Sequence, residues 1–434
     1  MVRDLFFRHA LLPGGWAENV RLSIRGGVIA GVEKDAPPHG EVGAIALPGM
    51  PNLHSHSFQR ALAGLTEHRG EGRENFWTWR DLMYRFALRM SPEDIEAVAA
   101  QAFVEMLEGG FCAVAEFHYL HHAPDGKPYD DIGETAARLG AAAAATGMDL
   151  TLLPVFYAHA GFGGTPPAKA QRRFINDLDS YARLHERCGK ITNTGVAPHS
   201  LRAVTPEELQ ALIVIAGAAP LHIHIAEQMA EVEDCVAWSG LRPVDWLLRH
   251  APVAANWCLV HATHVTPAEC AGMAASGAVV GLCPLTEANL GDGIFPMQDF
   301  TGKYGIGSDS NVLIGVADEL RMLEYSQRLA LRRRNVMATK AARSTATAMF
   351  QAAAAGGAQA LGASGGLAVG APANIIALAG GDPDIALAQF VFATRAPAVK
   401  DVWVRGRHCV RDGRHELAEQ SRKRFDAVVR KLLA

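Results

Sequence analysis

Short apolar runs alternate with longer amphipathic stretches through the middle of the chain. Three of the amphipathic stretches open in the same way, with a hydroxyl residue, a proline and a carboxylate two residues after the proline, at residues 91–94, 205–208 and 266–269. This order is typical of a helix N-terminus, because the hydroxyl caps free backbone N–H groups and proline fits the first helical position. The apolar runs have the length of strands, and we expect eight, at residues 44–52, 112–117, 151–156, 194–197, 221–225, 257–260, 279–282 and 305–307. Eight strands that alternate with helices predict a closed parallel barrel.

The two ends of the chain have a different pattern. Short β-rich pieces separated by glycine turns occur before residue 48 and return between residues 370 and 413. The fold class is therefore α/β: a (β/α)8 TIM-like barrel with a small β-sandwich formed by the N- and C-terminal segments. We predict that residues 1–47 and 364–415 form the sandwich, that residues 48–363 form the barrel, and that the charged residues 416–434 form a C-terminal helix.

Composition and charge exclude several classes of partner. Hydrophobic residues make up 49% of the chain and charged residues 20%, which is typical of a globular protein. The formal net charge is −4, and no run of Lys or Arg is longer than the three arginines at residues 332–334, so nucleic acid is not an expected partner. The longest apolar stretch, residues 211–219, is much shorter than the ~20 residues that span a bilayer, so no membrane is expected either.

The cysteines and the first residues of the chain indicate the cellular compartment in which the protein is expected. The seven cysteines form no CxxC pair and are odd in number, as expected of reduced thiols. The first residues show no apolar stretch followed by a small-residue cleavage site, which is the mark of a secretory signal. We therefore expect a cytoplasmic protein.

Histidines and carboxylates gather where the predicted strands end. The carboxyl ends of barrel strands meet at one mouth, so these side chains should converge there. The pair at positions 54 and 56 projects to one face of its strand, whereas only one of the pair at 222 and 224 needs to be a ligand. The residues in question are His54, His56, His222, His224, Glu227, His261 and Asp309.

Three imidazoles and one carboxylate form a donor set that suits Zn²⁺ or Fe²⁺ and leaves a coordination position for water, which is the arrangement of a catalytic site. Dinuclear hydrolases on this fold bridge their ions with a carboxylated lysine from a middle strand. Lys127, in a turn-like segment, is the only lysine between positions 35 and 168. One divalent metal ion is therefore expected.

The order of these residues resembles the deaminase branch of the amidohydrolase superfamily. HxH follows the first strand, HxxE the fifth, His the sixth and Asp the eighth, and residues 283–291 are similar to the CPxSNxxLG segment of that branch, although Glu287 and Ala288 loosen its middle. The resemblance implies that the metal ligands are His54, His56, His224 and Asp309.

Within that branch, residues 51–61, 76–80, 116–119 and 197–202 are similar to the formimidoylglutamate deiminases of histidine degradation. These enzymes hydrolyse the formimino group of N-formimino-L-glutamate to give N-formyl-L-glutamate and ammonia, with one bound metal ion, usually zinc. The resemblance implies that Asp309 is also the base, that His261 orients the attacking water and that Glu227 exchanges a proton with the substrate nitrogens.

The same resemblance implies a site for a small dicarboxylate. Its residues would be Gln59, Arg80, Tyr119, His199 and Arg202. An arginine fork can hold a carboxylate by two hydrogen bonds, and the other three side chains can each add one. Trp77 and Trp79, which flank this set, are assigned to packing.

Three alternatives stay open. A deaminase of the same branch that acts on a purine, pterin or triazine ring would keep the metal residues but would not need Arg80 and Arg202. Formiminoaspartate is a second alternative substrate. It is one methylene shorter than formiminoglutamate, and a pocket discriminates against such a difference by only ~1–3 kcal/mol of binding free energy. A non-catalytic barrel is disfavoured by the complete set of metal and proton-transfer residues.

Barrels with a side sandwich often dimerise in this superfamily, so a homodimer is expected.

Overall fold

The barrel strands follow one another in two parallel arcs. The computed structural model describes residues 3–68, 76–340, 342–394 and 399–434, with the side chains of residues 76–78 excepted. One arc contains β5 to β9 and the other contains β10 to β13, and within each arc neighbouring strands are parallel. Their bounds are β5 Met50–Ser55, β6 Phe111–His118, β7 Asp149–Phe156, β8 Asn193–Thr194, β9 Ala197–Pro198, β10 Leu221–Ile225, β11 Trp257–His261, β12 Val279–Leu282 and β13 Lys303–Ile306.

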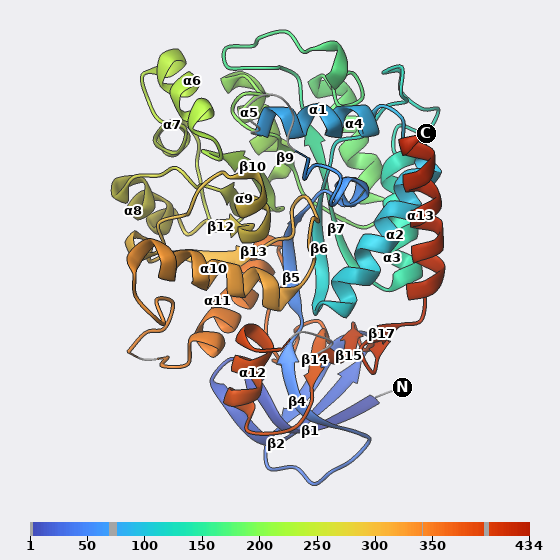
Figure 1. Cartoon of the computed structure of the whole chain (residues 1–434), viewed down its shortest axis with the longest axis vertical. Helices are drawn as coiled ribbons and strands as arrows, with labels where there is room; N and C mark the ends of the chain where they lie inside the picture. Colours follow the sequence, from blue (N-terminus) through green and yellow to red (C-terminus); the bar gives the residue numbers. More distant parts are fainter. Residues whose placement is uncertain (1–2, 69–75, 341, 395–398) are drawn as a thin grey trace.

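Single bridges join the arcs and close the barrel. Val196 pairs with Leu221 on one side, and Ser55 pairs with Asp309 on the other. Helices surround these strands (Figure 1). They are α1 Phe76–Ala87, α2 Pro92–Glu108, α3 Glu134–Thr146, α4 Leu178–Gly189, α5 Pro206–Ala216, α6 Met229–Ser239, α7 Pro243–His250, α8 Pro267–Ser276, α9 Pro284–Leu290, α10 Val316–Leu331, α11 Thr345–Ala360, α12 Pro383–Phe392 and α13 Ala418–Leu433.

The helix starts read from the sequence are confirmed. Ser91, Thr205 and Thr266 cap α2, α5 and α8, and each accepts a hydrogen bond from the backbone N–H three residues later. The carboxylate at that third position accepts one in return from the backbone N–H of the capping residue. Two otherwise unpaired donors are thereby satisfied at each helix start, which fixes where the chain turns from loop to helix.

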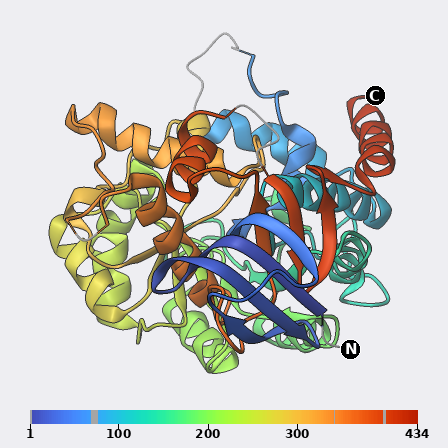
Figure 2. The ribbon, with the colours of Figure 1, turned by 90° about the horizontal axis from the view of Figure 1, so that it is seen from below.

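Both ends of the chain form a small β unit below the barrel, which Figure 2 shows from beneath. Its strands make one hydrogen-bonded sheet in the order β17-β16-β15-β14-β4-β1-β2-β3. They are β1 Arg3–Leu12, β2 Gly15–Arg25, β3 Val28–Glu33, β4 Glu41–Pro48, β14 Ile375–Leu378, β15 Val399–Val404, β16 Arg407–Arg411 and β17 Arg414–His415. The unit has an apolar core of its own, which includes Leu5, Val20, Leu22 and Trp403. A barrel with a small β unit built from both chain ends is thus confirmed.

Two predicted strands differ from the structure. The run at residues 194–197 is divided into two short strands, β8 and β9, by residues 195 and 196. Residues 44–52 are not a single barrel strand, because β4 belongs to the small sheet and β5 to the barrel, with Gly49 between them. A Cβ atom on Gly49 would lie 2.6 Å from Cys112 Sγ, so only glycine allows the chain to pass so close to β6. The Pro48-Gly49 pair is a turn signal, but the residues next to it on both sides are apolar and buried, so the run was read as one strand.

The β-rich C-terminal segment also contains a helix that was not predicted from the sequence. This is α12, which Asp382 caps by accepting hydrogen bonds from Asp384 N and Ile385 N. Within the described parts of the chain, no helix is long and apolar enough to cross a membrane.

Candidate active site

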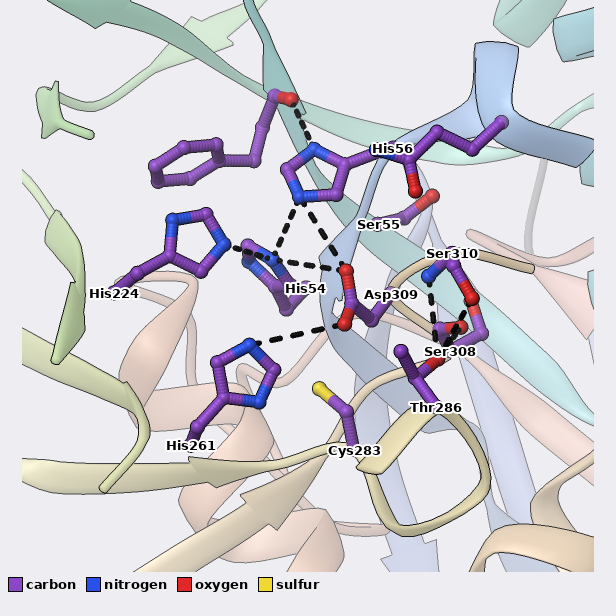
Figure 3. Close-up of polar contacts among 12 residues, drawn as sticks. His54, Ser55, His56, His224, His261, Cys283, Thr286, Ser308, Asp309 and Ser310 are labelled. Atoms are coloured by element: carbon purple, nitrogen blue, oxygen red, sulfur yellow. Dashed lines mark hydrogen bonds and ion pairs between the residues drawn. The ribbon is translucent and has the colours of Figure 1, made fainter. Parts of the chain in front are cut away.

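Three histidines and an aspartate converge inside the barrel mouth. His54 lies at the end of β5, His56 directly after it, His224 on β10 and Asp309 after β13. Their ligand atoms all lie within 4.8 Å of one another and all four side chains are buried (Figure 3). The Nε2 atom of His54 is 3.2 Å from that of His56 and 2.9 Å from that of His224, and Asp309 Oδ1 is 3.3 Å from His56 Nε2.

The hydrogen bonds made by the Nδ1 atoms of the histidine rings determine whether a proton or a lone pair on Nε2 faces the centre of the cluster. His56 Nδ1 donates to the Phe117 carbonyl at 2.8 Å, and His224 Nδ1 donates to the His199 carbonyl at 3.0 Å. A carbonyl only accepts, so a neutral ring in either position turns an Nε2 lone pair inward. Burial favours the neutral form, because it lowers the pKa of His54 to about 3 and also lowers the pKa of His56 and of His224. Lone pairs and a carboxylate that point at one centre fit a divalent metal ion.

Asp309 is held by its backbone. It has a left-handed φ of 45°, its N–H donates to the His54 carbonyl and its own carbonyl accepts the His56 N–H, each at 2.9 Å. Burial on its own would raise the pKa of Asp309, but the hydrogen bond and charges of His54, together with the charges of His261 and His56, outweigh it and hold the pKa below its usual range. The carboxylate is therefore ionised in this setting.

His261 and Glu227 lie beside the cluster. His261 Nε2 is 3.7 Å from Asp309 Oδ2 and 4.0 Å from Glu227 Oε1, while His261 Nδ1 is 3.3 Å from Glu287 Oε1. Burial lowers the pKa of His261, but the charges of Glu227, Glu287 and Asp309 outweigh it and raise the pKa overall. Burial also raises the pKa of Glu227. The pKa of Glu227 rises to about 7, so this carboxyl group can exchange a proton near neutral pH, whereas His261 holds its proton there.

One cavity is lined by His261, Glu227 and all of the predicted substrate-binding residues. Gln59 Nε2 donates to Tyr119 Oη at 2.7 Å, Arg80 lies over the ring of Tyr84 at 5.4 Å from its centre, and Arg202 Nη2 is 4.0 Å from Glu231 Oε2. The predicted residues that line the cavity are His56, Gln59, Arg80, Tyr119, His199, Arg202, His224, Glu227, His261 and Asp309.

The choice between the two histidines of β10 has a simple structural basis. Both side chains lie on the same face of β10, because residues two apart share a face of a strand. His222 lies nearer the start of the strand, where its Nε2 donates to the Ala360 carbonyl at 2.8 Å, whereas His224 lies nearer the carboxyl end and is part of the cluster.

Sequence reasoning missed several lining residues. Met83 and Tyr84 follow Arg80 at helical spacing on α1, so the i+3 and i+4 rule was a signal that could have found them. Tyr157 directly follows β7, so its place at a strand end was also a signal, whereas Phe174 comes from a loop and carried none. Trp79, which was assigned to packing, packs against the core and also lines the cavity. The side chain of Trp77 lies outside the described part of the chain.

The comparisons with known proteins agree with this geometry. The chain matches the amidohydrolase family over residues 45–409 and the N-terminal domain described as formimidoylglutamate deiminase HutF over residues 3–41. It is 51% identical to the formimidoylglutamate deiminase of Pseudomonas aeruginosa over 99% of both chains, and 28% identical to the 8-oxoguanine deaminase of the same species over 66% of this chain and 64% of that one.

Solved structures give the same result. An amidohydrolase from Brucella melitensis has a TM-score of 0.96 and 52% identity over 100% of both chains. An adenosine deaminase from Xanthomonas campestris, solved with bound zinc, shares the fold with a TM-score of 0.77 and 21% identity over 98% of both chains. The barrel and its cluster thus define a metal-dependent hydrolase, and the chain belongs to the amidohydrolase family. Within that family it belongs with the formimidoylglutamate deiminases, as the four sequence segments had indicated.

Proposed function

We propose that this protein hydrolyses N-formimino-L-glutamate to N-formyl-L-glutamate and ammonia, a step of histidine degradation. The observation that carries the proposal is that one cavity joins the histidine and aspartate cluster to two arginines, Arg80 and Arg202. The substrate carries an amidine at one end and two carboxylates at the other, and so matches both halves of the cavity. The relative from Pseudomonas aeruginosa supports the same reaction by its name and its 51% identity.

Carboxylate recognition in this proposal falls to the two arginines. A guanidinium group holds a carboxylate by two parallel hydrogen bonds, and Arg202 does so from a largely buried position, with its side chain 15% exposed. Gln59, Tyr119 and His199 supply single hydrogen bonds along the length of the substrate. A ring substrate would leave both guanidinium groups without an anionic partner from the ligand, which disfavours a purine, pterin or triazine.

The proposed ligands are His54, His56, His224 and Asp309, and the ion is Zn²⁺, with Fe²⁺ as the alternative, because both ions accept such a donor set. When bound, a divalent ion lowers the pKa of a coordinated water toward ~7 and so supplies hydroxide at neutral pH. Elemental analysis of the purified protein, followed by chelation and reloading with each ion in turn, tests this assignment.

Side chains of the protein transfer the protons during the proposed hydrolysis. Asp309 accepts a proton from the attacking water, whose oxygen bonds to the formimino carbon, and His261 Nε2 orients that oxygen by hydrogen bonding. Glu227 holds the amidine nitrogens and exchanges a proton with them. The carbon–nitrogen bond to the terminal nitrogen breaks, and this nitrogen leaves as ammonia with both protons of the water. The remaining oxygen becomes the formyl carbonyl, so atoms and charge balance.

Ammonia release from N-formimino-L-glutamate by the zinc-loaded protein tests the function directly. N-formimino-L-aspartate and guanine serve as parallel substrates. Rapid release from the glutamate compound supports the proposal. Preferred release from the aspartate compound would change the assigned substrate but keep the roles of Arg80 and Arg202, whereas preferred release from guanine would overturn those roles.

Two proposals concern the setting of the enzyme. We propose a cytoplasmic location, which the seven free and buried cysteine thiols support because such thiols persist in a reducing compartment. We also propose a homodimer, as is common for barrels of this family with a side β unit. Light scattering of the purified protein separates a dimer from the 46.4 kDa monomer.

A further inference from the structure

His261 lies between carboxylates on both sides of its ring. The Nε2 atom faces the cavity, with Asp309 and Glu227 at 3.7 and 4.0 Å, whereas Nδ1 faces away from it toward Glu287 at 3.3 Å. Glu287 lies on α9, directly after β12, with 5% of its surface exposed, and it does not line the cavity. It therefore contacts the proposed proton-transfer machinery only through His261.

Glu287 is itself fixed in place. Its Oε1 atom accepts the Cys283 N–H at 2.9 Å, its own N–H donates to the Cys283 carbonyl at 2.9 Å, and its carbonyl accepts the Asp292 N–H at 2.9 Å. The carboxylate is thus held at the turn between β12 and α9. An ionised carboxylate only accepts hydrogen bonds, so the partner nitrogen of His261 must carry the proton.

We propose that Glu287 is a positioning residue for the deimination reaction, and this inference rests on the proposed function. It fixes the ring plane of His261 and keeps a proton on Nδ1, so that Nε2 is directed toward the attacking oxygen. Outer partners of this kind orient a reactive or ligating histidine in other sites, and their loss typically costs ~10–100-fold in activity or metal affinity.

Glu287→Gln is the first test, because the amide keeps the size and the acceptor atom but removes the charge. We expect kcat for N-formimino-L-glutamate to fall ~10–100-fold, with KM within about threefold, full metal content and an unchanged thermal midpoint. Unchanged kcat in a folded, metal-loaded variant would overturn the inference.

Glu319→Gln is the matched control. Glu319 is a fully buried carboxylate that holds the same helix α9, since its Oε2 accepts the Leu285 N–H at 3.0 Å, but none of its hydrogen bonds involves His261. We expect kcat of this variant to stay within about threefold of the parent. A loss as large as that of Glu287→Gln would show that support of α9, rather than positioning of His261, is what matters.

A double-mutant cycle with His261→Asn separates the two roles further. If Glu287 acts through His261, adding Glu287→Gln to His261→Asn changes kcat/KM by less than about twofold, because the partner is already gone. Losses that multiply across the two variants would overturn the inference.

¹⁵N NMR spectra of the histidines in the zinc-loaded protein report the tautomer of His261 and do not depend on enzymatic activity. We expect His261 to carry a proton on Nδ1, and a ring protonated on Nε2 alone would overturn the inference. If the parent protein releases no ammonia from N-formimino-L-glutamate, the proposed function fails, while these spectra still decide whether Glu287 sets the tautomer.

Discussion

Replacing Arg202 by glutamine tests whether the cavity recognises a carboxylate. The guanidinium group lies 4.0 Å from Glu231, and Glu231 keeps two other donors, the backbone N–H groups of Ala226 and Glu227 at 3.1 and 3.3 Å. Removal of Arg202 therefore does not leave a buried carboxylate without partners, and the fold should persist. What is lost is the bond to the substrate carboxylate.

Truncating one partner of a buried charge pair costs ~2–5 kcal/mol. At ~1.36 kcal/mol per factor of ten, kcat/KM for N-formimino-L-glutamate should fall between ~30-fold and ~5,000-fold. Arg202→Lys keeps the charge but loses the fork, so we expect an intermediate loss. Arg242→Gln is the control, because Arg242 binds Glu269 Oε2 at 3.0 Å and does not line the cavity.

The assay is ammonia release measured with the acid and with its two monoamides. The parent enzyme should discriminate against the monoamide that lacks the carboxylate bound by Arg202, and Arg202→Gln should not. Retention of kcat/KM within about threefold, with full metal content, would refute the reasoning. Equal losses on the acid and on both monoamides would refute it as well, since they would indicate general damage to the site.

Three further predictions follow from the structure. Asp309→Asn should bind metal poorly and lose ~10²–10⁴-fold in kcat, as loss of a general base typically does; elemental analysis with kinetics checks this, and near-normal turnover would exclude the proposed base. Burial lowers the pKa of His121 to about 3 from an ordinary value of 6.5, so its contribution to stability is present above pH 6.5 and is lost as the pH falls toward 3. Denaturant titrations should show that His121→Gln flattens this decline by on the order of 1 kcal/mol per pH unit, and parallel curves for parent and variant would contradict it. A Cβ atom on Gly356 would lie 1.9 Å from the Tyr304 carbonyl, so Gly356→Ala should lower the thermal midpoint by an amount equivalent to ~1–3 kcal/mol, whereas Gly189→Ala, with nothing within 4 Å, should not.

Much of the barrel could be predicted from the sequence because burial and helix capping leave local marks. A strand buried on both faces is a continuous apolar run, and a hydroxyl followed by proline and a carboxylate marks a helix start. The junction at Gly49 carried only the Pro48-Gly49 turn signal, and the apolar residues on both sides of it, which are buried in different units, were read as one strand. For α12 a mark was present, because Asp382 and Pro383 form a cap and a first helical position, but the β-rich surroundings concealed it.

The candidate site was only partly predictable, for a different reason. Strand ends of a parallel barrel meet, so His54, His56, His224 and Asp309 could be brought together from their positions alone. Phe174 reaches the cavity from a loop, whose course depends on distant contacts rather than on local pattern. A sequence therefore identifies the proposed metal ligands more readily than the residues that line the cavity around them.

Backbone conformation adds what side-chain identity does not give. Ala226, His261, Ala262 and Asp309 all have positive φ, between 45° and 66°, and all follow or end barrel strands at the mouth. Non-glycine residues in this region cost ~1–3 kcal/mol each and persist only where the surroundings fix them. Asn311 does so for Asp309, because its side-chain amide donates to the carbonyl oxygens of His56 and Asp309 at 3.0 and 2.9 Å. The fold thus holds the chain in unfavourable turns at the points where His261 and Asp309 must face one another, and this direction of the side chains, rather than their presence, is what a sequence cannot reveal.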